Sequence, residues 1–137
     1  MDRSTEQMNV LLATPVSAVY HQATAVDVDT FVSNFTNNLN WQSQRTVVVI
    51  DNENNIFGVI TRQDIVSMGK RQLNPRSTRA WEICSHHVVI TSPDSSLSDA
   101  VAIMEKNNIH HLVVCDNGKL VGVISSLDIA TFLSQSH

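Results

Sequence analysis

The sequence has few of the residues that mark disordered or fibrous chains. It holds three prolines and four glycines among 137 residues, and 42% of its residues are apolar. Collagen-like and low-complexity sequences need far more proline and glycine, and disordered chains are poorer in apolar residues. A chain of this length buries roughly two thirds of its unfolded surface without disulfides or metals. We therefore expect a soluble globular protein.

Long apolar runs and surplus positive charge are also missing. The longest apolar runs, Val47–Ile50 and Leu112–Cys115, are far too short to span a membrane, and the first nine residues are too polar for a signal peptide. The net charge of −4 argues against nucleic-acid binding through the overall field, because phosphate neutralisation needs excess Lys and Arg. The expectation is a cytoplasmic protein with no membrane or nucleic-acid partner.

Recognised metal and catalytic motifs are absent from the sequence. Cys84 and Cys115 have no motif spacing, which predicts two buried, reduced core thiols. No zinc-finger spacing joins the cysteines and histidines, so no metal is expected. Neither a nucleophile elbow nor a Walker-type loop is present. We therefore expect that the chain is not an enzyme.

What the sequence does contain is an internal repeat. The heptads GVITRQD (Gly58–Asp64) and GVISSLD (Gly122–Asp128) share a glycine, two apolar residues, a hydroxyl and an aspartate. Each heptad overlaps the second of two short apolar runs, which are separated by the turns DNENN and DNGK. These runs predict one β-hairpin in each copy. The predicted strands are 47–50 and 56–60 in the first copy, and 112–115 and 120–124 in the second.

A hydroxyl-x-x-acid spacing predicts a capped helix before each hairpin. Thr24 with Asp27 and Ser96 with Asp99 fit the capping box, and apolar residues at helical spacing follow both. The apolar positions are Val28, Phe31, Val32 and Phe35 in the first copy, and Leu97, Ala100, Val101 and Met104 in the second. The register of the first helix stays open, because extra residues occur around NNLNWQSQ.

Further elements are expected outside these motifs. Short strands are predicted at Val16–Val19 and Val88–Ile90, and a leading helix at Glu6–Leu12. Pro75 interrupts any long helix between the copies. Four of the nine basic residues lie in this segment, which is compatible with a solvated connector or with a basic contact for a phosphate or partner. They are Lys70, Arg71, Arg76 and Arg79.

Taken together, the two copies resemble a tandem pair of cystathionine β-synthase (CBS) domains, or Bateman module. The signature of that family is Gly-apolar-x-[Thr/Ser]-x-x-Asp. Two sets of residues fit it: Gly58, Thr61 and Asp64, and Gly122, Ser125 and Asp128. The resemblance implies an α+β fold of two β-α-β-β-α repeats that pack with pseudo-twofold symmetry. The expected organisation is a first repeat with its N-terminal segment over 1–69, a linker over 70–80 and a second repeat over 81–137.

The resemblance also implies a regulatory homodimer that binds an adenine nucleotide (AMP, ADP or ATP) in the cleft between the repeats and reports it to a regulated protein. The aspartates of the heptads would hold the ribose hydroxyls, with help from the Ser and Thr hydroxyls. The paired histidines are placed for the phosphate, and only one of them should point into a given cleft, because strand side chains alternate faces. Adenine would lie at the edges of the short leading strands. The residues assigned to the nucleotide are Asp128, Ser125, His110, His111, Ile90, Asp64, Thr61, Arg45 and Ala18.

A second interpretation of the heptads is purely structural. Thr61 with Asp64 and Ser125 with Asp128 have capping-box spacing and could simply satisfy open N–H groups at a helix start. A helix N-terminus is also an anion site, and a glycine before it allows close backbone approach. The alternative function is a ligand-free module for protein interaction or dimerisation.

Overall fold

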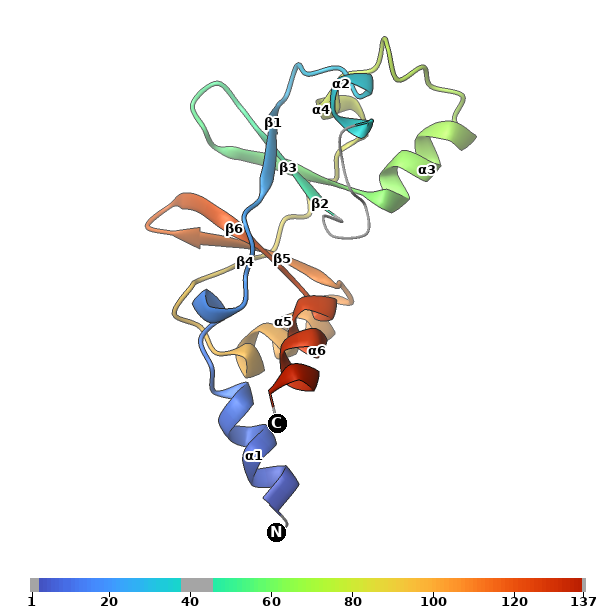
Figure 1. The fold of residues 1–137 in the computed structure, drawn as a ribbon. Helices are drawn as coiled ribbons and strands as arrows, with labels where there is room; N and C mark the ends of the chain where they lie inside the picture. The colour runs from blue at the N-terminus through green and yellow to red at the C-terminus, as the bar shows by residue number, and fades with distance from the viewer. Residues whose placement is uncertain (1–2, 38–45, 137) are drawn as a thin grey trace. The chain divides into compact units, whose positions relative to one another are not determined.

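The computed structural model describes residues 3–37 and 46–136, which form two compact units (Figure 1). Unit 1 joins the chain up to Gln22 with the chain from Val89 onward, and unit 2 is Ala23–Val88. These boundaries differ from those of the sequence repeats. The N-terminal segment belongs to the unit of the second repeat, and residues 81–88 belong to the unit of the first. Each unit therefore contains a segment that precedes the other repeat in the chain.

Unit 2 contains a three-stranded sheet with helices after β1 and β3. β1 (Thr24–Asp27) runs parallel to β2 (Thr46–Ile50), and β2 pairs antiparallel with β3 (Ile56–Thr61). The helices are α2 (Ser33–Thr36), α3 (Arg62–Lys70) and α4 (Ala80–Ile83). The middle strand is almost entirely buried. The core consists of Val32, Phe35, Val47, Val49, Ile60, Met68, Ala80 and Ile83.

Unit 1 has the same order of elements around the second hairpin. β4 (Ile90–Thr91) runs parallel to β5 (His111–Asp116), which pairs antiparallel with β6 (Lys119–Ser125). α5 (Leu97–Asn107) lies between β4 and β5 in the chain, and α6 (Ser126–Gln135) follows β6. The N-terminal segment adds α1 (Arg3–Leu12) and a 3-10 helix, η1 (Val16–Ala18). The core consists of Val16, Leu97, Ala100, Met104, Leu112, Val114, Ile124 and Ile129.

The predicted α+β fold, the β-α-β-β-α order and both hairpins are confirmed. The hairpins even share a register shift, between Val49 and Ile50 and between Val114 and Cys115. In the DNGK turn, Asn117 and Gly118 have φ angles of 52° and 79°. A two-residue type I′ turn needs positive φ at both positions, which explains this Asn-Gly pair. Among the described residues, no helix is long and apolar enough to cross a membrane.

The predicted strand at Val16–Val19 is wrong. Val16–Ala18 forms η1, directly after Pro15, and the Val19 N–H donates to the Val16 carbonyl. The N–H of Val16 donates to Ser95, and that of Ser17 to the Pro93 carbonyl, so these groups bond a loop and not a strand. The second predicted leading strand, at Val88–Ile90, is displaced to Ile90–Thr91.

The predicted helix start at Thr24 is also wrong. Thr24–Asp27 is β1, which pairs along its whole length with β2, and the Asp27 carboxylate accepts the Asp29 N–H at 2.9 Å. Helical structure begins only at Ser33. The equivalent prediction in the second copy is confirmed, since Ser96 Oγ accepts the Asp99 N–H at 3.0 Å. The extra residues at 38–44 lie outside the described part of the chain.

The cysteines are free thiols, as predicted, but neither is fully buried. Burial raises the pKa of both thiols, and the nearby Asp64 carboxylate raises the pKa of Cys84 further. Cys115 lies beside the register shift near the exposed end of β5, which explains why it is only half-buried.

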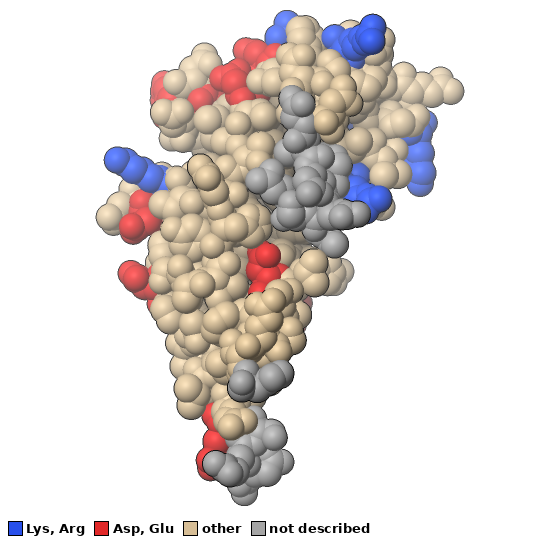
Figure 2. Space-filling model, in the orientation of Figure 1, with Lys and Arg blue, Asp and Glu red and all other residues tan. Residues whose placement is uncertain are grey.

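Charge is distributed differently in the two units. Residues 23–88 hold six basic and six acidic residues, and the rest of the chain holds three basic and seven acidic ones. In unit 2, Lys and Arg gather over α3 and the loop that follows it (Figure 2). Arg79 is bound within the unit, because its guanidinium lies 4.6 Å from the Phe31 ring centroid and donates to the Asp29 carbonyl at 2.9 Å. The exposed basic residues of this region are Arg62, Lys70, Arg71 and Arg76.

Candidate functional site

Each heptad ends a strand and starts a helix. Thr61 is the N-cap of α3 and Ser125 is the N-cap of α6, and the aspartate three residues later lies in the first helical turn. Both pairs form the predicted capping boxes. The caps satisfy some of the free N–H groups at the helix starts, and the positive end of each helix dipole favours a negative group there. The two aspartates are thus fixed at equivalent places in their units.

In unit 2, the cap uses one carboxylate oxygen. Asp64 Oδ2 accepts the Thr61 N–H at 2.8 Å and the Thr61 hydroxyl at 3.1 Å. Thr46 pairs with Thr61 across the hairpin and is 3% exposed, and its hydroxyl has no partner among the described residues. Arg45, assigned to this site from the sequence, lies outside the described residues.

In unit 1, the cap has an additional neighbour. Asp128 Oδ2 accepts the Ser125 N–H at 2.8 Å, and the Asp128 N–H donates to Ser125 Oγ at 3.0 Å. His21 Nε2 lies 3.1 Å from the same Oδ2. The side chains of His21 and Asp128 are 33% and 25% exposed, so solvent reaches both. His21 was not assigned to any site from the sequence.

The glycines of the heptads make room for the chain itself. A Cβ on Gly58 would lie 2.6 Å from the Ser85 carbonyl oxygen and 2.9 Å from Cys84 Sγ. A Cβ on Gly122 would overlap the His21 carbonyl oxygen and the Tyr20 ring. The sequence predicts that these glycines allow close approach to the backbone. In the structure, a segment of the same unit occupies this space at each glycine.

The segments that lie against the two glycines, Tyr20–His21 and Cys84–Ser85, are called the crossing segments, and they are equivalent. His21 pairs with Val123 through two backbone hydrogen bonds of 3.1 and 3.0 Å, and Ser85 pairs with Val59 through two of 2.8 and 3.0 Å. Val59 and Val123 occupy the same place in their heptads, one residue after the glycine. Ser85 in unit 2 therefore corresponds to His21 in unit 1.

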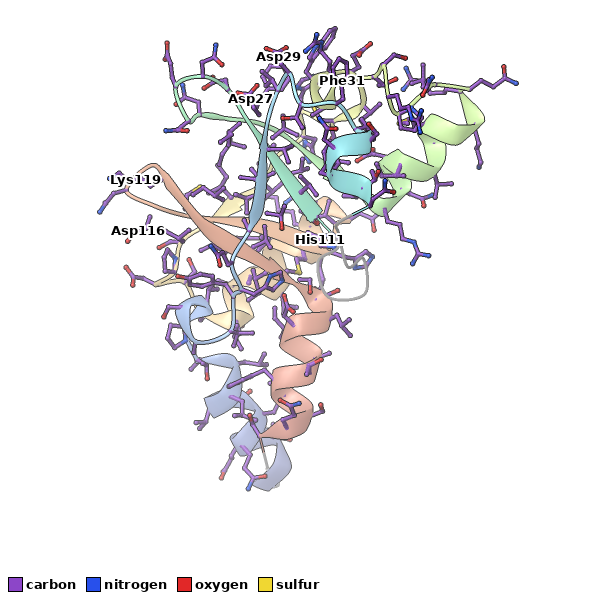
Figure 3. All side chains as sticks on the ribbon, turned by 45° about the horizontal axis from the view of Figure 1, so that its top comes forward. Asp27, Asp29, Phe31, His111, Asp116 and Lys119 are labelled. Atoms are coloured by element: carbon purple, nitrogen blue, oxygen red, sulfur yellow. The ribbon has the colours of Figure 1, made fainter. Side chains whose placement is uncertain are left out.

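The paired histidines at the start of β5 lie in different surroundings. His111 begins β5 and pairs with Ser125, at the opposite end of the hairpin from the turn with Asp116 and Lys119 (Figure 3). Residues opposite one another in antiparallel strands share a face, so His111 lies on the same face as Ser125. His110 is exposed, and its Nδ1 lies 3.5 Å from Ser126 Oγ. The alternation expected of a strand thus separates the two rings.

His110 borders a groove of about 440 Å³ within unit 1. The groove lies between α5 and α6, and most of its lining is apolar. Its other lining residues are Val101, Met104, Glu105, Asn108, Ile109, Ser126, Ile129, Ala130 and Leu133. The remaining residues assigned from the sequence, Ala18 and Ile90, both belong to unit 1 and are exposed.

The structure thus groups only some of the assigned residues. Ser125 and Asp128 are hydrogen-bonded to each other at the end of β6, where His111 pairs with Ser125, and Thr61 lies with Asp64 at the end of β3. His21 could not be assigned from the sequence, because it is far from Asp128 in the chain and lies in no motif. An alignment of its segment with Cys84–Ser85 would have been the signal. Within residues 3–37 and 46–136, no three His, Cys, Asp or Glu side chains are grouped to hold a metal ion.

Comparison with known proteins identifies relatives of this architecture. Residues 80–135 match the family model of the CBS domain. An uncharacterized protein of Methanopyrus kandleri is 35% identical over 89 residues, which cover 61% of this chain and 44% of that protein. An uncharacterized protein of Methanocaldococcus jannaschii is 31% identical over 87 residues, which cover 63% of this chain and 21% of that protein. The chain therefore spans less than half the length of either relative.

Solved structures share the fold of most of the chain. The CBS domain pair of protein MJ0100, in complex with 5′-methylthioadenosine and S-adenosyl-L-methionine, has a TM-score of 0.77 at 19% identity, covering 91% of this chain and 99% of that one. Hypoxic Response Protein I, with two coordinated zinc ions, has a TM-score of 0.72 at 19% identity, covering 86% and 98%. Residues 80–135 thus match the CBS-domain family model, and the chain has the fold of the solved tandem CBS-domain pairs.

Proposed function

We propose that the chain is a regulatory module that binds an adenine nucleotide of the AMP, ADP or ATP class and reports it to a partner protein. The observation that carries this proposal is the fixed position of Asp64 and Asp128. Their caps use Oδ2, and no described residue bonds Oδ1 of either carboxylate. A carboxylate oxygen accepts hydroxyl hydrogen bonds strongly, so both aspartates are suited to ribose.

The fold comparison supports an adenosine ligand. The CBS domain pair of protein MJ0100 is in complex with two ligands that both contain adenosine. The two oxygens of a carboxylate can accept from the 2′- and 3′-hydroxyls of ribose, and an aspartate at a helix cap holds such a carboxylate on a short side chain. We therefore assign Asp128 and Ser125 to ribose in unit 1, and Asp64 and Thr61 in unit 2.

His111 is the histidine that we assign to the phosphate in unit 1, because it shares a face with Ser125. The test compares His111→Gln with His110→Gln, whose ring lies at the groove. His111→Gln should weaken AMP binding severalfold and leave adenosine binding unchanged, whereas His110→Gln should change neither. Equal effects of the two substitutions on AMP would contradict this assignment.

A thermal-shift screen tests the proposed function directly. The ligands are AMP, ADP, ATP, NAD and S-adenosylmethionine, with Zn²⁺ as a further arm. A ligand at a hundred times its dissociation constant should stabilise the protein by about 2.7 kcal/mol. Isothermal titration calorimetry then gives the stoichiometry. If no adenine compound raises the melting temperature, and only Zn²⁺ or nothing does, the nucleotide proposal is wrong.

The groove in unit 1 favours a second role, in homodimer formation. Its apolar lining includes Ile129, Ala130 and Leu133 of α6, and Leu127 on the same helix is 48% exposed. Light scattering should give a particle of twice the 15.2 kDa chain mass. Ala130→Arg should produce the monomer. Trp81→Arg is the matched control, because Trp81 is also 48% exposed but lies outside the groove. A wild-type monomer at tens of micromolar would refute this role.

A further inference from the structure

The contact between His21 and Asp128 places a ring nitrogen on the carboxylate assigned to ribose. His21 Nε2 lies 3.1 Å from Asp128 Oδ2, which also accepts the Ser125 N–H at 2.8 Å. A carboxylate oxygen has two lone pairs, so these two neighbours use the accepting capacity of Oδ2. Within the described residues, Oδ1 has no partner. A ligand that approaches Asp128 therefore finds one open oxygen and one occupied oxygen.

Unit 2 shows what the site is like without this ring. Asp64 Oδ2 also has two donors, but both belong to Thr61, the cap residue itself. The Thr61 hydroxyl can rotate to another acceptor without any movement of the backbone, so a ligand can easily displace it from Asp64 Oδ2. Ser85, which corresponds to His21, directs its Oγ to the N–H of His87 at 3.2 Å.

The main chain of His21 is fixed, and its ring has one contact besides Asp128, since Nδ1 lies 3.3 Å from the Gln22 carbonyl oxygen. The two hydrogen bonds of His21 to Val123 and the space beside Gly122 fix the main chain across β6. The side chain can still leave Asp128 by rotation, because it is 33% exposed. The carboxylate can thus be released without breaking the strand pairing.

We infer that His21 is a specificity-determining residue of the unit 1 site, where its ring competes with one of the two ribose hydroxyls for Asp128. This inference rests on the proposed function. A vicinal diol fits a free carboxylate with one hydroxyl on each oxygen. Here the second hydroxyl gains its hydrogen bond only when the His21–Asp128 contact is broken. His21 therefore reduces the preference of this site for ribose over 2′-deoxyribose, which needs one oxygen.

The test measures AMP and 2′-deoxy-AMP affinities by NMR titration of the backbone amides of Ser126–Ile129, which report on unit 1 alone. His21→Ser gives unit 1 the residue that unit 2 has at the equivalent position, Ser85. In the wild type, AMP must break the His21–Asp128 contact to use both oxygens. A solvent-exposed pair of this kind is weak, so removing the ring should raise AMP affinity by only about fivefold. The affinity for 2′-deoxy-AMP should stay the same. His21→Gln, which keeps an N–H donor of similar reach, should retain the wild-type ratio of affinities.

Ser85→Ala is the matched control in unit 2, and it should leave the ratio at unit 1 unchanged. Equal gains for both nucleotides in His21→Ser would overturn the inference, as would a loss of AMP affinity, which would make the ring a ligand contact. If wild type binds neither nucleotide, the proposed function falls and the inference with it. If wild type binds AMP and the ratio does not respond, only the inference falls. Should His21→Ser not fold, His21→Asn replaces it with the same expectation, because its short amide does not reach Asp128.

Discussion

The two heptads build the same helix cap, but their aspartates have different neighbours. In unit 2, both donors to Asp64 Oδ2 come from Thr61, whereas in unit 1 Asp128 Oδ2 is shared between Ser125 and His21. The caps are alike because the hydroxyl-x-x-Asp spacing is local. The neighbours differ because the equivalent crossing segments carry different residues, His21 in unit 1 and Ser85 in unit 2. The repeat thus fixes where a carboxylate lies, and the crossing segment decides what a ligand meets there.

The largest expected effect comes from closing the space at the crossings. Gly122→Ala should lower the free energy of unfolding by about 3 kcal/mol and Gly58→Ala by about 2 kcal/mol, because an added methyl group in a packed site forces its neighbours to move. The larger effect belongs to Gly122, whose Cβ would overlap both a backbone oxygen and the Tyr20 ring. Urea denaturation of both variants measures the difference.

Gly69→Ala is the control for these substitutions. A Cβ on Gly69 meets nothing within 4 Å, and the residue lies in α3. Alanine should stabilise the helix there by about 0.5–1 kcal/mol. If Gly58→Ala and Gly122→Ala change the free energy of unfolding as little as Gly69→Ala does, the crossing segments are not packed tightly against Gly58 and Gly122.

The next effect separates ligand binding from capping at each aspartate. Asp128→Ala and Asp64→Ala should each weaken nucleotide binding at their own unit by about 1.5–3 kcal/mol, because a charge-assisted hydrogen bond is lost. The loss of the cap should lower the free energy of unfolding by only about 1 kcal/mol. Calorimetric titration and thermal unfolding of the same samples give the two quantities. Unchanged affinity in a folded Asp128→Ala protein would leave that residue only its structural role.

The smallest effect concerns the two thiols. Burial raises the pKa of Cys84 and Cys115 above the usual value, so both should react slowly with iodoacetamide at pH 8 and faster as the pH rises. Asp64 adds to the rise at Cys84. Asp64→Asn should therefore increase the thiolate fraction and the labelling rate of Cys84 at pH 8, without changing Cys115. Mass spectrometry of the labelled peptides follows both cysteines together. An equal change at both would point to general loosening of the structure.

Local patterns predicted much of the fold and part of the site. The hairpins and the caps at Ser96, Thr61 and Ser125 follow from neighbours in the chain, whereas the β-α-β-β-α order came from the family resemblance. The same reasoning failed at Thr24, whose spacing imitates a cap but which lies in a strand paired to β2. It also failed at Val16, whose backbone bonds a loop near Ser95. Both failures occur where a distant segment supplies the hydrogen-bond partners.

By itself, the sequence determined two similar hairpins and two capped aspartates, because turn, cap and strand preferences act over a few residues. Only the tertiary structure decided that the N-terminal segment joins the second hairpin, that Gly58 and Gly122 each lie against a crossing segment, and that His21 Nε2 lies beside Asp128. These features depend on contacts between residues far apart in the chain. Their partners are selected by the packing of whole elements, which no short pattern encodes.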